Sequence, residues 1–326
     1  MKILARVILG IVGLVVIGMG LAIAFGGPGQ PHPQPASIGE PFTKVDYSDL
    51  PPVSYYAARD GTKLAYREYV HVGSKVVGSV VLVHGLGTSS GSMHVLAKSF
   101  AAAGFDVYSL DIRGHGESGV MGQIMYVGQL EDDIEDFVRA IKPTRPLTLV
   151  GYSAGGGFAL RIAGSSRQKL FDNYVLLAPG LGLEAPTMRK DRFDFISVGM
   201  PRLIAIALLD AAGVHAFDVL PVARLGFEGE FAKSHHMHML TSYSFPLLSN
   251  FGPERDYRAN IRAVDRPLRV VVGHEDELFY ADRFAEVFKA EGKDVPVTIV
   301  QGIGHGTLVL EPIPIQATID AVKVMD

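Results

Sequence analysis

The chain has 326 residues, of which 48% are hydrophobic, 20% are charged and none is cysteine. The hydrophobic fraction excludes a largely disordered protein, and the lack of cysteine excludes a disulfide framework, a cysteine-ligated metal centre and a thiol nucleophile. With 30 basic and 34 acidic side chains, the net charge of −4 argues against a nucleic-acid-binding protein.

Residues 7–25 form an uncharged apolar run at the N-terminus. About 20 apolar residues are needed to cross the hydrocarbon core of a bilayer as a helix. Lys2 and Arg6 precede the run, and the next charges are Glu40 and Lys44. Positive charge on this flank predicts a cytoplasmic N-terminus and a body outside the cytoplasm. We therefore expect residues 1–25 to be a single-pass membrane anchor.

A cleaved signal peptide is the alternative for this segment. Ala22-Ile23-Ala24 has the small-x-small form of a cleavage site, and cleavage near Ala24 would give a secreted or periplasmic protein. The run is longer than the roughly 7–15 apolar residues of a typical signal peptide, which favours the anchor.

Residues 26–41 contain five Pro and four Gly. This composition predicts a semi-rigid, extended tether between the anchor and the body. On this interpretation, removing residues 1–41 should release an active, soluble enzyme.

The pattern of residues 42–326 predicts one α/β domain. Two β-rich runs, 53–57 and 63–69, flank Asp60-Gly61, which predicts a hairpin. Strands are predicted at 79–84, 105–110, 147–150, 174–178, 268–273 and 295–300, and helices at 93–103, 127–141, 154–163, 281–290 and 315–324. Alternation of this kind predicts a mainly parallel sheet after an antiparallel hairpin.

The stretch from about 180 to 267 interrupts the alternation, because it is too long for a loop and has no clear buried strand. We expect a helical cap over the carboxyl ends of the strands, where ligands bind in open α/β sheets. Its apolar residues are expected either to line a pocket or to form the cap's own core; they are Phe193, Phe195, Ile196, Leu203, Ile204, Leu208 and Leu209.

Gly151-Tyr152-Ser153-Ala154-Gly155 has the form G-x-S-x-G between a predicted strand and a predicted helix. In this context the motif is a sharp turn that raises the serine hydroxyl above the sheet at a helix N-terminus. Ser153 is therefore the expected nucleophile, and a structural turn serine is the alternative.

A serine hydroxyl needs a base to take its proton. His305 lies between two glycines on the loop after the last predicted strand, which makes it the expected base. The carboxylate that orients the base is expected after the preceding strand. There the spacing G-x-x-D favours Asp276 over Glu275 and Glu277, which are expected to be solvated loop charges.

Two backbone N–H groups are expected to stabilise an oxyanion. One belongs to Ala154, the residue after the nucleophile, and the other to Leu86 in His84-Gly85-Leu86-Gly87. His84 itself is expected to be a structural hydrogen-bonding residue.

Together with the segment Asp111–Ser118 (DIRGHGES), these motifs resemble the α/β-hydrolase superfamily, and most closely its lysophospholipase, monoacylglycerol lipase and serine-aminopeptidase-like branch. The resemblance covers about residues 53–326 and implies the α/β-hydrolase fold. It also implies that Asp111 and His115 shape the site without a chemical role. Two features differ from the monoacylglycerol lipases, which usually have His-Ser-Met at 152–154: this chain has Tyr152-Ser153-Ala154, and its Gly157 resembles the perhydrolase and esterase branch.

We therefore expect a membrane-tethered serine hydrolase that cleaves a lipid- or acyl-type carboxylic ester through an acyl-enzyme. An amidase or aminopeptidase, a perhydrolase-type esterase and a non-catalytic binding module are the alternatives. No cofactor is expected. His235 and His238 would share a helix face, but neither an acid nor a further His stands nearby with ligand spacing, so no metal is expected.

Overall fold

The computed structural model describes residues 2–325, and its centre is an eight-stranded sheet with the order β1-β2-β4-β3-β5-β6-β10-β11. β2 is antiparallel to both β1 and β4, and the other neighbours are parallel. The predicted α/β fold with a hairpin before a parallel sheet is thus confirmed. The strands are β1 (Val53–Ala57), β2 (Lys63–Tyr69), β3 (Gly78–Val83), β4 (Phe105–Leu110), β5 (Leu147–Tyr152), β6 (Asn173–Leu177), β10 (Leu268–Gly273) and β11 (Val297–Val300).

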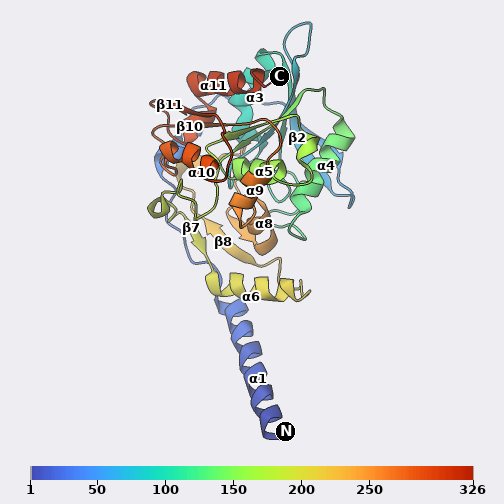
Figure 1. Cartoon of the computed structure of the whole chain (residues 1–326), viewed down its shortest axis with the longest axis vertical. Coiled ribbons are helices and arrows are strands. Elements are labelled where there is room, and N and C mark those ends of the chain that lie inside the picture. The colour runs from blue at the N-terminus through green and yellow to red at the C-terminus, as the bar shows by residue number, and fades with distance from the viewer. Residues whose placement is uncertain (1, 326) are drawn as a thin grey trace.

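Helices cover both faces of the sheet (Figure 1). On one face α3 (His94–Ala102) packs against α11 (Pro312–Lys323). On the other, α4 (Gln129–Ile141) and α5 (Ala154–Ala163) are joined by an ion pair between Glu131 and Arg161. α9 (Tyr257–Ala263) packs on α5, and α10 (Phe284–Ala290) follows β10. Because helices shield both faces, the central strands are buried on both sides, which explains their continuous apolar sequences.

The cap contains a small sheet that the sequence did not predict. β7 (Ile196–Val198), β8 (Pro221–Leu225) and β9 (Ser242–Ser244) pair antiparallel beside α6 (Met200–Ala211), α7 (Gly229–Ala232) and α8 (Phe245–Asn250). The predicted helical cap thus also carries a short antiparallel sheet. Strands of three to five residues are too short to show alternation.

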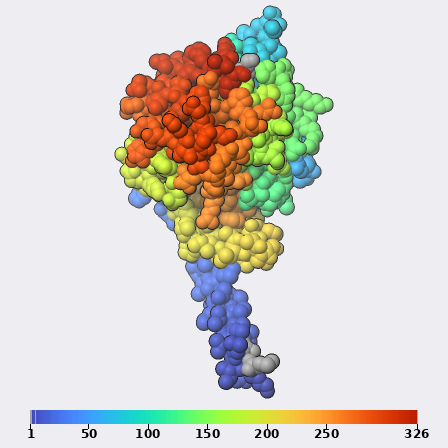
Figure 2. Space-filling model, in the orientation of Figure 1, coloured from blue at the N-terminus to red at the C-terminus, as the bar shows by residue number. Residues whose placement is uncertain are grey.

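Helix α1 (Lys2–Phe25) projects from the body on the side of the cap (Figures 1 and 2). By length and composition it is long and apolar enough to cross a membrane. Its last turn is docked on the cap: Ile23 packs with Ala205, Ile206 and Val222. Arg202 of α6 donates hydrogen bonds to the carbonyl oxygens of Ile23 (2.8 Å) and Ala24 (3.2 Å), two groups that the helix leaves free at its C-terminus.

The segment 26–41 differs from the predicted tether, because it lies along the cap and then becomes helical. The backbone N–H of His32 donates to Asp194, and that of Gln34 donates to Gly226. Residues Ala36–Thr43 form helix α2, which the Pro and Gly content had obscured. The spacing of Ile38 and Phe42 puts both side chains on one helix face, and each is only 3% exposed. Burial of this apolar face stabilises a helix that its composition alone would not.

Truncation after residue 41 would therefore not simply remove a spacer, since it would take away Ile38 and leave Phe42 without its helix.

The contact between Arg202 and the end of α1 generates a first prediction. In Arg202→Met the carbonyl groups of Ile23 and Ala24 lose a cationic donor, which should cost about 1 kcal/mol of local stability at this junction. Hydrogen–deuterium exchange of residues 22–27 should accelerate. Arg192→Met is the matched control, because Arg192 is exposed and its ion pair is with its neighbour Asp191. Unchanged exchange in Arg202→Met would show that α1 is not held by this contact.

Candidate active site

Ser153 occupies a strained turn between the end of β5 and the start of α5. Its backbone has φ 57° and ψ −116°, a conformation rarely adopted by a residue with a side chain. A Cβ atom on Gly151 would lie 2.1 Å from the carbonyl oxygen of Gly155, and one on Gly155 would lie 2.4 Å from that of His84. Both flanking glycines of G-x-S-x-G are thus required by close backbone approach.

The three residues predicted to act together lie in one hydrogen-bonded chain. Nε2 of His305 is 3.0 Å from Oγ of Ser153, and Nδ1 of His305 is 2.8 Å from Oδ2 of Asp276. Asp276 follows β10 and His305 follows β11, so parallel strands bring them to the edge of the sheet where β5 also ends. Asp276 and His305 are buried, whereas Ser153 is partly exposed. Such an arrangement can transfer a proton from the serine hydroxyl to the imidazole.

The carboxylate of Asp276 is fixed on both oxygens. While Oδ2 faces His305, Oδ1 accepts hydrogen bonds from the backbone N–H groups of Leu278 (2.8 Å) and Phe279 (2.9 Å). Glu275, the competing acid, is exposed and pairs with His274.

Glu277 has a structural contact that the sequence prediction missed. Its Oε2 accepts a hydrogen bond of 2.7 Å from the backbone N–H of His305. The hydroxyl of Tyr152 donates to the carbonyl oxygen of the same residue at 2.9 Å. The backbone of His305 is therefore held on both sides, and the description of Glu277 as a solvated loop charge was wrong. Nothing in the sequence distinguished Glu277, because its partner lies 28 residues away.

Leu86 and Ala154, the predicted oxyanion donors, line the same cavity as Ser153 and His305. The loop of Leu86 touches the serine turn, since a Cβ on Gly85 would lie 3.4 Å from Cβ of Ser153. The buried ring of His84 supports this loop: Nδ1–H donates to the carbonyl of Gly85 (2.8 Å), and Nε2 accepts from the N–H of Ile112 (3.3 Å). Burial lowers the pKa of His84, which keeps the ring neutral for this pattern.

A second hydrogen-bonded chain holds the other end of the loop. The N–H of Gly87 donates to the hydroxyl of Tyr243 (2.7 Å), which donates to Nε2 of His115 (2.7 Å). Burial lowers the pKa of His115 well below its usual value, so the neutral ring can accept. Its Nδ1 faces the carbonyl of Ile112. Tyr243 belongs to the cap strand β9, and no sequence motif marked it.

Asp111 and Arg113, two charged residues of the Asp111–Ser118 segment, form hydrogen bonds and ion pairs with neighbouring residues. Asp111 accepts hydrogen bonds from the N–H groups of Ser90 (2.8 Å) and Glu117 (2.9 Å). Arg113 forms a two-bond pair with Asp133 and a further pair with Asp60. These contacts join the hairpin, α4 and the loop, and they fit the shaping role that the resemblance implied.

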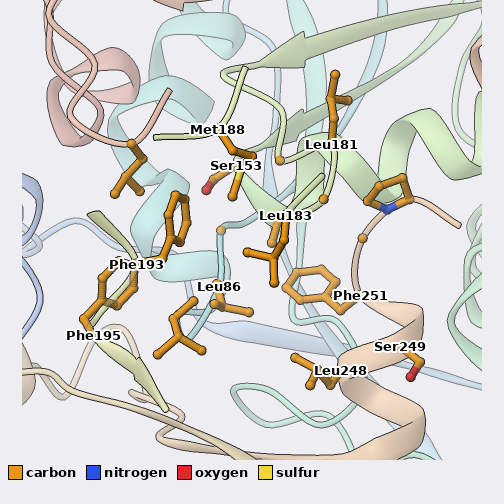
Figure 3. A pocket seen from close by; sticks show the side chains of 18 of the residues that line it. Leu86, Ser153, Leu181, Leu183, Met188, Phe193, Phe195, Leu248, Ser249 and Phe251 are labelled. Carbon is orange, nitrogen blue, oxygen red and sulfur yellow. The ribbon is translucent and has the colours of Figure 1, made fainter. Parts of the chain in front are cut away.

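A cavity of about 1070 Å³ opens at Ser153. Its volume is slightly above the range of roughly 300–1,000 Å³ for small-molecule sites. Most of its lining is apolar, and Figure 3 shows Ser153 facing a space surrounded by Leu86, Leu183, Phe193, Phe195 and Phe251. Six of the seven predicted cap residues line it: Phe193, Phe195, Ile196, Leu203, Ile204 and Leu208. The seventh, Leu209, instead packs against the cluster of Ile23, Ala205, Ile206 and Val222.

The histidines of the cap do not form the helical pair considered from the sequence. Helix α7 ends at Ala232, before His235 and His238, and the ring of His236 stacks on Tyr47 with centroids 4.9 Å apart. Among residues 2–325, side chains close enough to hold a metal are those of Asp210 in the last turn of α6 and of His215 and Asp218 after it, and none of them lines the cavity.

Comparison with known proteins gives a consistent picture. Residues 74–213 match the family Serine aminopeptidase, S33. A monoacylglycerol lipase of Mycolicibacterium smegmatis is 29% identical over 245 residues, which make up 70% of this chain and 81% of that protein.

Solved structures show the same fold. A soluble variant of monoglyceride lipase from Saccharomyces cerevisiae, in complex with a substrate analog, has a TM-score of 0.61 and 19% identity, covering 90% of this chain and 98% of that one. Monoacylglycerol lipase of Paleococcus ferrophilus has a TM-score of 0.57 and 20% identity, covering 80% and 98%.

The contact between Glu277 and His305 yields a second prediction. Glu277→Ala removes the acceptor that holds the backbone of His305, and a small displacement of a reacting group costs up to about 100-fold in rate. We expect kcat to fall by roughly 10- to 100-fold. Glu277→Gln keeps an acceptor oxygen and should stay near wild type.

Glu275→Ala is the matched control, because Glu275 is exposed and lies in the same loop as Glu277. This variant should have wild-type kcat. If Glu277→Ala and Glu275→Ala have the same kcat, the backbone contact has no influence on the position of His305.

Proposed function

Because the chain belongs to the α/β-hydrolase superfamily and is a serine hydrolase, we propose that it cleaves the ester bond of a monoacylglycerol-like lipid, with Ser153, His305 and Asp276 as its catalytic triad. The hydrogen-bonded chain of these three side chains at the end of a large apolar cavity is the observation that carries this proposal.

In the first step, Oγ of Ser153 attacks the ester carbonyl while Nε2 of His305 takes its proton. Asp276, bound to Nδ1–H, keeps His305 in the tautomer that leaves Nε2 free and stabilises the imidazolium that forms. The backbone N–H groups of Leu86 and Ala154 are the proposed donors to the oxyanion.

In the second half of the reaction, His305 returns the proton to the departing alcohol oxygen, and the acyl group remains on Ser153. Water then attacks the acyl-enzyme with His305 again as the base, which releases the carboxylic acid and restores the serine hydroxyl.

The lining of the cavity supports a lipid-like substrate. Burying the methylene groups of an acyl chain against apolar side chains is favourable by about 0.8 kcal/mol per group. The relative with 29% identity is a monoacylglycerol lipase, which agrees with this substrate class. An amide would use the same triad, so an amidase or aminopeptidase is the alternative that the substrate assay must test.

The third prediction concerns the triad. The wild-type chain should hydrolyse monoacylglycerols and p-nitrophenyl esters faster than p-nitroanilides, and should be labelled by a fluorophosphonate probe. Ser153→Ala should remove labelling and lower kcat by about 10⁶, and Asp276→Asn should lower kcat by about 10⁴ through the wrong tautomer of His305.

Circular dichroism of both variants controls for folding. Retention of a tenth of the activity in Ser153→Ala, or faster cleavage of anilides than of esters by the wild type, would contradict the assignment.

We further propose that α1 is an uncleaved membrane anchor with its N-terminus in the cytoplasm and the catalytic body outside. At about 1.5 Å per residue the 24-residue helix is about 36 Å long, enough for a hydrocarbon core of roughly 30 Å. Lys2 and Arg6 support the orientation. The packing of Ile23 on the cap supports an intact chain, because cleavage after Ala24 would remove this contact from the mature protein.

The fourth prediction is that the protein in the membrane fraction begins at Met1 or Lys2 and that its body is digested by protease added from outside the cytoplasmic membrane. N-terminal sequencing and the protease assay measure the two points separately. A mature chain that begins at Phe25 would mean cleavage and release, and a protected body would reverse the orientation.

A further inference from the structure

Helix α2, which precedes the first strand of the sheet, forms part of the wall of the catalytic cavity. Ile38 and Phe42 line the cavity together with Ser153 and His305, although more than 100 residues separate them from either. Both residues are 97% buried in the cavity wall. A change in the volume of either side chain therefore changes the space available to a bound ligand.

One side of α2 contacts the loop that carries His305. A Cβ atom on Gly306 would lie 2.2 Å from the carbonyl oxygen of Ile38 and 3.2 Å from its Cα. The residue next to His305 therefore packs directly on the backbone of α2, which leaves no space for the helix to shift toward the triad.

Helix α2 also contacts aromatic residues of the cap. A Cβ on Gly39 would lie 2.7 Å from the ring of Phe231, and the rings of Phe42 and Phe231 have centroids 5.7 Å apart. Phe231 in turn meets Phe227 edge-on at 5.8 Å, and both also line the cavity. The ring of Phe227 lies over Gly87 in the loop of Leu86. Helix α2 is thus fixed between the His305 loop and the cap.

We propose that α2 determines acyl-chain selectivity, with Ile38 and Phe42 forming the wall that limits the length and width of the acyl group. This inference rests on the proposed ester hydrolysis and names the part of the substrate that α2 contacts.

The chemistry of the wall favours the acyl group over the alcohol. Ile38, Phe42, Phe227 and Phe231 present only carbon atoms to the cavity, and these match methylene groups. A glycerol-like leaving group carries hydroxyl groups that would lose hydrogen bonds to water at such a surface. A hydrophobic pocket discriminates by about 10- to 200-fold for each added or missing methylene group.

The test measures kcat/KM of the full chain on p-nitrophenyl esters from butyrate to palmitate at one detergent concentration. Phe42→Ala enlarges the cavity and should shift the ratio of long- to short-chain kcat/KM upward by roughly tenfold or more. Ile38→Phe fills space and should shift the same ratio downward. Because the ratio compares two substrates of one sample, it does not depend on the fraction of folded protein. Phe42→Leu, a smaller change, should shift the ratio in the same direction as Phe42→Ala and serves if that variant does not fold.

Ser37→Ala is the matched control, because Ser37 is an exposed residue of the same helix, and its ratio should equal that of the wild type.

A second series holds the acyl group at butyrate and varies the alcohol. The kcat/KM values of this series should be unaffected by Phe42→Ala and Ile38→Phe. Unchanged acyl profiles in Phe42→Leu and Ile38→Phe, or a change confined to the alcohol series, would overturn the inference while leaving ester hydrolysis intact. Failure of the wild type to hydrolyse any ester would overturn the proposed function and this inference together.

Discussion

The backbone conformation of Ser153 is the constraint on which the arrangement of this site depends. A positive φ at a residue with a side chain costs about 1–3 kcal/mol, and the surrounding chain must compensate for it. The N–H of Ser153 donates to Leu177 of β6, and its carbonyl accepts from Gly157 and Gly180. These bonds explain why glycine stands at 157 as well: a Cβ there would lie 2.3 Å from the carbonyl of Gly180. Gly157 is therefore accounted for by packing at the turn.

Other segments approach this turn and are held by backbone hydrogen bonds as well as by side chains. Glu277 accepts from the backbone N–H of His305, Tyr152 donates to its carbonyl oxygen, and the hydroxyl of Tyr243 accepts from the N–H of Gly87. The cap and the sheet domain thus meet at the loops around Ser153, and a neutral His115 is needed to complete the contact between them. A polar network of this kind is stable in the interior because its donors and acceptors are paired.

The parts of this structure that could be predicted from the sequence are those with a local signal. The buried strands have continuous apolar runs, and G-x-S-x-G is a motif of five consecutive residues between a strand and a helix. The position of Ser153, Asp276 and His305 after three strands of the sheet was therefore predictable from the chain order. Helix α2 was missed because Pro and Gly occur before it and within it. The spacing of Ile38 and Phe42 indicates a helix only once the cavity that buries both side chains is known. Tyr243 and Glu277 were missed because each is defined by one partner far away in the sequence.

The docked end of α1 has a mechanical consequence. Its contacts are with cap residues, and the following segment is bonded to Asp194 and Gly226, which also belong to the cap. A force applied along α1 would therefore act on the cap first, then on α2, and last on the eight-stranded sheet. Tilting or rotating α1 would displace the cap residues that line the cavity. The hydrogen-bonded strands would keep Ser153, Asp276 and His305 at their mutual distances. The contacts of α1 are thus made with the cap, whereas Ser153, Asp276 and His305 are positioned by the ends of strands in the eight-stranded sheet.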